Sequence, residues 1–131
     1  KSPETNEGVY YVDENLKEST NNTSEYKYSI KLNYIPEGFT LTDSSEYSSM
    51  HDATYYNINK YFYVAKSIVS DTISIDTENA QTEYIDINGN KAFLSIKPNQ
   101  IIMVWENNDI LYHINGNIDK ETIIKIAENM E

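Results

Sequence analysis

The sequence predicts an α+β domain: an antiparallel β-sheet of about six or seven strands, with a C-terminal amphipathic helix packed on one face. Two patterns support this prediction. Several segments bounded by turn residues alternate apolar and polar residues at the period of half-buried strands, whereas the C-terminal segment repeats its apolar residues at helical spacing. Twelve tyrosines in 131 residues also suit pleated strands better than long helices.

The predicted helix begins after Asp119, whose carboxylate can accept hydrogen bonds from free backbone N–H groups at the positive end of the helix dipole. Ile118 and Ile123 occupy the two positions of a hydrophobic staple. The apolar face consists of Ile123, Ile126, Ala127 and Met130. Because so short a helix is marginal alone, we expect packing on the sheet to stabilise it.

The pair Asn88-Gly89 predicts a β-hairpin, because both central positions of its turn need positive φ. Residues 84–87 and 92–96 are its two strands. Residues 101–105 are apolar on both faces, which predicts a strand near the centre of the sheet. Residues 110–114 alternate again and return beside them.

The first half of the chain predicts further strands. Residues 26–32 alternate apolar and polar side chains and are expected to form a strand. Pro36 and Gly38 suit the second and fourth positions of a turn, and residues 39–41 resume a short strand. Residues 43–52 are polar, and we expect an excursion at the sheet edge.

Two tyrosine-rich strands are expected next, at residues 55–58 and 61–68, separated by a turn at residues 59–60. Residues 70–80 are acidic and rich in hydroxyl groups, and are interpreted as a loop that contains a short strand.

The domain organisation follows from a change in composition. Residues 1–25 are polar and are interpreted as a lead-in or linker with a short strand at residues 9–12. Residues 26–131 then form a single α+β domain. Acceptor patterns for N-glycosylation at Asn21 and Asn22 are interpreted as chance matches in a polar loop.

Composition excludes several classes of function. The net charge of −11, with ten scattered lysines and no arginine, argues against nucleic-acid binding and against anionic lipid surfaces. The chain has no cysteine, so disulfides and thiol catalysis are excluded. No apolar run approaches the roughly 20 residues of a membrane span, so we expect a domain that does not itself cross the membrane.

The residues that could carry chemistry do not form a recognisable motif. His51 could bind a metal only if Asp43, Glu46 or Asp52 converged on it, and His113 lies on a predicted strand. Both histidines are interpreted as surface or edge residues. The acidic residues Asp71, Asp76 and Glu78 lack the spacing of a calcium loop and are interpreted as a solvated acidic face. We predict no metal and no cofactor.

No G-x-S-x-G elbow, P-loop or G-x-G-x-x-G pattern is present, so the sequence predicts no enzyme. The candidate ligand-binding residues are Tyr55, Tyr56, Tyr61 and Tyr63, whose rings could stack on a glycan or grip a peptide. The alternative is that they pack against neighbours and keep their hydroxyl groups in water.

Six short elements, taken in order, resemble DUF4367, a domain of unknown function in Gram-positive bacterial proteins. They are residues 34–39 (YIPEGF), 74–80 (SIDTENA), 87–89 (ING), 104–106 (VWE), 112–117 (YHINGN) and 124–130 (IKIAENM). The resemblance implies an extracytoplasmic position, C-terminal to a membrane-spanning helix or lipoprotein signal, in proteins of which some are similar to anti-sigma factors. It implies no catalytic residues.

The leading hypothesis is therefore a non-catalytic extracytoplasmic sensing or interaction domain of a membrane-anchored or lipoprotein-type bacterial protein. Its partner would be a protein or a component of the envelope. The alternative is a carrier of a small ligand, lipid or peptide, which requires a sizeable apolar cavity. A third hypothesis, an envelope hydrolase, requires titratable groups that converge in a cleft.

Overall fold

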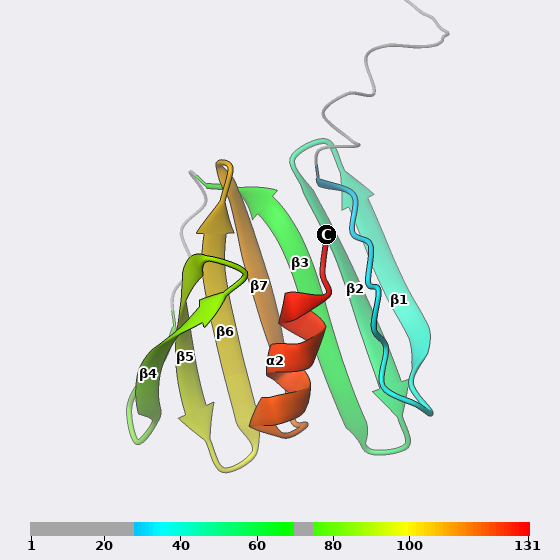
Figure 1. Ribbon diagram of the computed structural model, residues 1–131. Coiled ribbons are helices and arrows are strands. Elements are labelled where there is room, and N and C mark those ends of the chain that lie inside the picture. The colour runs from blue at the N-terminus through cyan, green and yellow to red at the C-terminus, as the bar shows by residue number, and fades with distance from the viewer. Residues whose placement is uncertain (1–27, 70–74) are drawn as a thin grey trace, which may run out of the picture.

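The computed structural model describes residues 28–69 and 75–131. In these residues, seven antiparallel strands form one sheet in the order β1-β2-β3-β7-β6-β5-β4, and helix α2 follows β7 (Figure 1). The elements are β1 (Thr40–Tyr47), β2 (Met50–Asn57), β3 (Lys60–Ile68), β4 (Gln81–Ile87), β5 (Asn90–Lys97), β6 (Gln100–Asn107), β7 (Ile110–Gly116) and α2 (Lys120–Glu128). The predicted antiparallel sheet and C-terminal helix are confirmed.

The sheet consists of two meanders, β1 to β3 and β4 to β7, joined where β7 pairs with β3. Ile114 of β7 faces Val64 on one side and Met103 on the other, so the last strand in the sequence lies at the centre. The predicted Asn88-Gly89 hairpin is confirmed, with φ angles of 52° and 91° at its two turn residues.

Helix α2 starts as the sequence predicts. The side chain of Asp119 accepts a hydrogen bond from the backbone N–H of Thr122 at 2.8 Å. Ile123 and Ile126 are fully buried, in the same core cluster as the sheet residues Met103 and Ile114. Burying such a side chain contributes about 1.5–3 kcal/mol, so this contact explains why a nine-residue helix is stable here.

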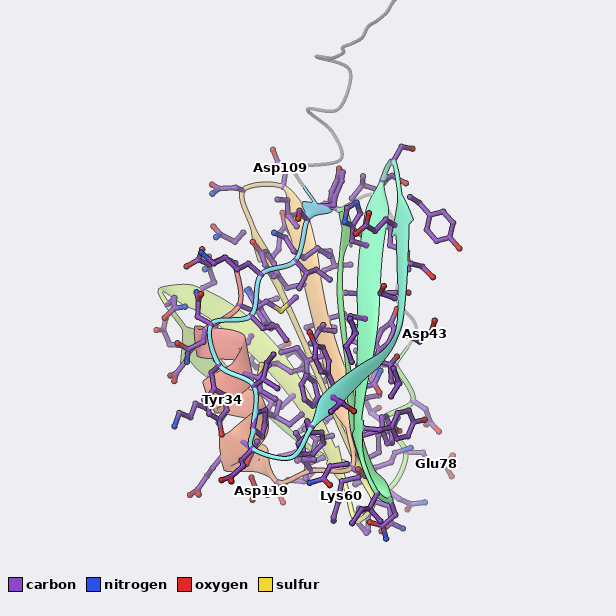
Figure 2. The ribbon with its side chains drawn as sticks, turned by 90° about the vertical axis from the view of Figure 1, so that its right-hand side faces the viewer. Tyr34, Asp43, Lys60, Glu78, Asp109 and Asp119 are labelled. Carbon is purple, nitrogen blue, oxygen red and sulfur yellow. The ribbon has the colours of Figure 1, made fainter. Side chains whose placement is uncertain are left out.

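The strand register divides the side chains between two faces. The helix face carries the buried core residues, among them Phe62, Val64, Leu94, Met103 and Ile114. The opposite face, here the second face, carries the intervening residues, among them Tyr63, Phe93, Val104 and His113. Figure 2 shows α2 and the segment that contains Tyr34 on the same side of the sheet, with Nζ of Lys125 4.4 Å from the centre of the Tyr34 ring.

The strand predicted at residues 26–32 is wrong over the described residues 28–32. Leu32 forms an isolated bridge with Met130, and Lys31 exchanges two backbone hydrogen bonds with Glu131. The alternation arises because Tyr28, which is helical, and Ile30 and Leu32 of the extended segment after it all pack on the core outside the sheet. The predicted lead-in at residues 1–25, its short strand and both glycosylation patterns lie outside the described residues.

The polar excursion predicted at residues 43–52 is also wrong, although its position at the sheet edge is confirmed. These residues form most of β1 and the start of β2. An edge strand needs backbone pairing on one side only and no apolar face, so polar residues suffice. The next turn lies at Ile58-Asn59 rather than at residues 59–60. Residues 75–80 are a loop without a strand, and residues 70–74 lie outside the described part.

Candidate functional site

The four candidate tyrosines do not share one surface. Tyr55 lies on the helix face, where its ring stacks on Phe62 at a centroid distance of 4.9 Å and an angle of 7°. The register places the other three, Tyr56, Tyr61 and Tyr63, on the second face. The Tyr56 and Tyr61 rings are 6.0 Å apart and tilted. A single four-ring platform is therefore not formed.

Tyr63 belongs to a small polar group on the second face. Its hydroxyl donates a hydrogen bond to Asp52 at 2.9 Å, and its ring meets the edge of the His113 ring at 5.6 Å. Burial, and then the hydrogen bond and charge of Asp52, raise the pKa of Tyr63. Burial also lowers the pKa of His113, which favours a neutral imidazole. His113 lies on the central strand and is half-buried, so it is not an edge histidine.

The prediction of a surface or edge histidine is wrong for His51, which is 6% exposed. The register turns its side chain toward the helix face, where it is flanked by Glu46 of β1 and Lys66 of β3. Asp43 and Asp52 lie on the second face by the same register, so strand parity separates them from the His51 side chain. The acidic group imagined around His51 therefore reduces to Glu46.

Lys66 is a buried cation, with 5% of its surface exposed. Its Nζ donates a hydrogen bond to the carbonyl oxygen of Ser29 at 2.9 Å and lies 5.3 Å from the centre of the Tyr112 ring. Burial lowers the pKa of Lys66, and the charge of Glu131 partly opposes that effect. These contacts hold the N-terminal extended segment against the sheet.

A hollow of about 160 Å³ lies beside β1, on the helix face. Its walls include Ile30, Leu41, Ser44, Glu46, His51 and Ala53. The Nε2 atom of His51 is buried and has no hydrogen-bond partner. Buried polar atoms in proteins are nearly always paired, so this atom requires a specific explanation. We call this feature the β1 hollow.

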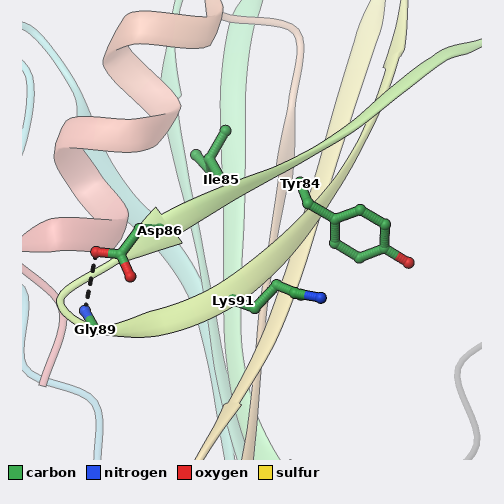
Figure 3. Close-up of a pocket in the computed structure, with 5 residues that line it drawn as sticks. All are labelled: Tyr84, Ile85, Asp86, Gly89 and Lys91. Atoms are coloured by element: carbon green, nitrogen blue, oxygen red, sulfur yellow. Dashed lines mark hydrogen bonds between the residues drawn. The ribbon is translucent and has the colours of Figure 1, made fainter.

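A second hollow, of about 350 Å³, lies at the β4–β5 hairpin (Figure 3). Asp86 accepts a hydrogen bond from the backbone N–H of Gly89 at 3.1 Å, and Nζ of Lys91 lies 5.1 Å from the centre of the Tyr84 ring. Figure 3 shows Tyr84 and Lys91 directed to the same side of the hairpin. The polar groups that line this second hollow therefore already interact with other residues of the same hairpin.

Within residues 28–69 and 75–131, no three histidine, aspartate or glutamate side chains gather where a metal could bind. Asp76 instead accepts hydrogen bonds from the backbone N–H of Glu78 and from Lys97, at 2.9 and 3.2 Å. These bonds lower the pKa of Asp76. Asp71 lies outside the described residues.

The family model of DUF4367, a domain of unknown function, matches residues 29–130. The chain belongs to the DUF4367 family. The extended segment before β1, the whole sheet and α2 therefore form the DUF4367 domain. In the part of this domain that the structure describes, no helix has the length and hydrophobicity needed to cross a membrane.

A crystal structure of MucB in complex with MucA(peri) is similar to this DUF4367 domain, with a TM-score of 0.46 and 14% sequence identity. The match covers 78% of this chain and 35% of the MucB chain, so this chain spans about a third of its length. The sequence matches no curated protein.

Sequence reasoning missed Lys66 of the DUF4367 domain, and it considered His51 only as a metal ligand or a surface residue, not as a buried one. A signal for Lys66 was present, because Phe62, Val64 and Lys66 share one parity and the first two are apolar. The residues around His51 in the sequence are polar and were interpreted as a loop, so they gave no indication that its side chain is buried. Its burial depends on the extended segment at Ser29 and Ile30, which is distant in sequence.

Proposed function

We propose that this domain is a non-catalytic, extracytoplasmic interaction domain of a membrane-anchored or lipoprotein-type bacterial protein, and that it binds an extended segment of a partner protein along β1. One observation carries the proposal: β1 is an exposed edge strand. In the described residues it pairs with β2 alone.

The composition of β1 favours pairing with another chain. Seven of its eight residues are exposed, and Ser45 is half-buried. Leu41 and Tyr47 are apolar or aromatic and are 54% and 61% exposed. Natural edge strands are commonly protected by lysine or proline, and β1 has neither. Its bulge lies between Leu41 and Asp43, and the register is regular from Asp43 to Tyr47.

The remaining surfaces give less support to catalysis. His51 and His113 lie on opposite faces of the sheet, so they cannot act on one substrate group together. The groups with shifted pKa values are divided in the same way, with Lys66 on the helix face and Tyr63 on the second face. A hydrolase would need such groups to converge in one cleft.

The carrier alternative also has less support. A carrier needs a sizeable apolar cavity, whereas fully buried side chains fill the space between α2 and the sheet. They are Phe62, Val64, Leu94, Met103, Ile114, Ile123 and Ile126. The β1 hollow is small and lies outside this core.

The proposed location can be tested because the chain has no cysteine. A Ser48→Cys variant of the full-length protein places one thiol in the exposed β1–β2 turn. We expect a membrane-impermeant maleimide to label this thiol in intact cells, with the full-length protein that keeps Ser48 as control. Labelling only after the cells are permeabilised would contradict an extracytoplasmic location.

Binding along β1 can be tested by site-specific photo-cross-linking in cells. A photoreactive phenylalanine at Tyr47 should cross-link to a discrete partner, whereas the same group at the exposed Tyr84 on β4, at the opposite edge, should not. Ser44→Lys, which adds a charge to the edge, should remove the Tyr47 adduct. Equal cross-linking from both positions, or none from Tyr47, would overturn the proposal.

A further inference from the structure

We infer that the β1 hollow receives a lysine or arginine side chain from an extended peptide segment that pairs with β1. The inference rests on the proposed function and names the chemistry of the partner. The partner would be a positively charged segment, bound through its backbone along β1 and selected through one long basic side chain in the hollow.

The position of the hollow fits such a segment. A strand added beside β1 would point alternate side chains toward the helix face. On that face, Glu46 lies on the edge strand and His51 faces it from β2. Strands are spaced about 4.8 Å apart, so His51 lies two strand spacings, roughly 10 Å, from the added strand. Only a long side chain reaches that far.

The lining of the hollow has the polarity that a basic side chain requires. Among its described lining residues, Glu46 is the one whose carboxylate lies on the helix face, and none is a lysine. Ile30, Leu41 and Ala53 provide apolar wall for a methylene stem, as long cationic side chains prefer. The net charge of −11 adds a favourable field for a cationic segment.

The unpaired Nε2 of His51 is a candidate acceptor for such a side chain: His51 lines the hollow, and Nε2 itself is buried with almost no solvent-accessible surface. In the tautomer protonated at Nδ1, Nε2 can accept a hydrogen bond from an ammonium or guanidinium group. Lys66, on the other side of His51, makes no hydrogen bond with Nε2; its Nζ donates to the carbonyl of Ser29 and lies 5.3 Å from the centre of the Tyr112 ring. A basic side chain inserted past Glu46 would therefore be held by a carboxylate at the mouth and by Nε2 at depth.

The test uses the 131-residue protein and labelled peptides of about ten residues, the length of a long strand. The host peptide alternates threonine and valine, with one central lysine. In matched peptides, arginine, norleucine or glutamate replaces that lysine, and a terminal residue keeps the net charge constant. Because hydrogen bonds to charged groups contribute about 1.5–3 kcal/mol, we expect lysine and arginine peptides to bind about ten-fold tighter than the norleucine peptide.

Two variants on β1 distinguish binding of the basic side chain in the hollow from attraction by the overall negative charge of the protein. Glu46→Gln removes the charge on the helix face and should abolish the preference for lysine over norleucine. Asp43→Asn removes the same charge from the second face of β1 and should leave the preference unchanged. The ¹⁵N chemical shift of His51 Nε2 should move on binding of the lysine peptide and not of the norleucine peptide.

Each outcome decides the inference. Equal binding of lysine and norleucine peptides would overturn it, because the hollow would then not select a basic side chain. Equal effects of Glu46→Gln and Asp43→Asn would also overturn it, since the preference would then come from overall charge. In both cases the Tyr47 cross-link can persist, so the proposed function would stand. Loss of that cross-link is instead the failure of the proposed function.

Discussion

Lys31 and Glu131 exchange two backbone hydrogen bonds, each 2.8 Å long, and so join the segment before β1 to the segment after α2. The pairing brings Met130 opposite Leu32, and the Met130 side chain is 7% exposed within the core cluster. The two ends of the described fold thus close over one edge of the core.

Met130→Ala tests the contribution of this closure. Truncating a buried methionine removes apolar contact and leaves a cavity, so we expect the free energy of unfolding to fall by about 2–3 kcal/mol in urea titrations. Glu128→Ala, at an exposed position of α2, is the control and should change it by less than about 0.5 kcal/mol. Equal effects of the two variants would show that Met130 contributes nothing through burial.

Gly116→Ala tests the contact between β7 and β3. A Cβ atom at Gly116 would lie 2.5 Å from the carbonyl oxygen of Tyr61 and 3.0 Å from Cα of Phe62, so the backbone would have to move. We expect a loss of about 2–3 kcal/mol in unfolding free energy. The control is Gly89→Asn, in open space at a turn position that asparagine tolerates, which should cost less than about 1 kcal/mol. A smaller loss at Gly116 than at Gly89 would contradict the close approach.

Ile58→Asn should stabilise the protein. Ile58 has a φ angle of 60° and is 94% exposed, so it has a strained backbone and gains nothing from burial. Asparagine adopts this conformation more readily, and we expect a gain of about 1 kcal/mol, measured as a higher urea midpoint. The reverse change at a matched turn, Asn108→Ile with a φ angle of 54°, should cost a similar amount. A loss of stability in Ile58→Asn would mean that Ile58 makes a contact that offsets its strain.

The raised pKa of Tyr63 predicts that the folded protein loses stability in alkaline solution. Its pKa is higher in the folded protein than the ordinary value of 10.0, because burial and Asp52 disfavour the phenolate. The stabilisation is therefore complete below pH 10.0 and is lost as the pH rises toward the folded pKa. Urea midpoints measured from about pH 9 to about pH 12 should fall, and less steeply in Tyr63→Phe. An identical fall in both proteins would contradict this origin.

The features predictable from the sequence are those specified by neighbouring residues. Asn88-Gly89 determines its turn through backbone conformation, and Asp119 caps α2 through a hydrogen bond three residues away. The order of the strands was not predictable, because the pairing of β7 with β3 depends on packing between residues far apart in sequence. The alternation of apolar and polar residues wrongly predicted a strand at residues 28–32 for a related reason. An extended segment outside a sheet has the same two-residue alternation of side chains as a strand.

The candidate site was less predictable than the fold. Its tyrosines were selected by composition, but strand parity sends Tyr55 to one face and Tyr63 to the other. The β1 hollow could not be found from local sequence, since its walls come from β1, β2 and the extended segment at Ile30. β1 was not predicted from its sequence, because an exposed edge strand can be polar on both faces and then lacks the alternation of apolar and polar residues.

The central position of β7 has a consequence for when the domain can fold. A chain that emerges N-terminus first exposes β1 to β6 before the strand that joins the two meanders is present. Until β7 has emerged, β3 and β6 each have an unpaired side, which is the condition for aggregation. Contacts of such long sequence separation also form slowly. This architecture therefore favours a chain that stays unfolded until β7 is available, after which β3 and β6 can both complete their pairing.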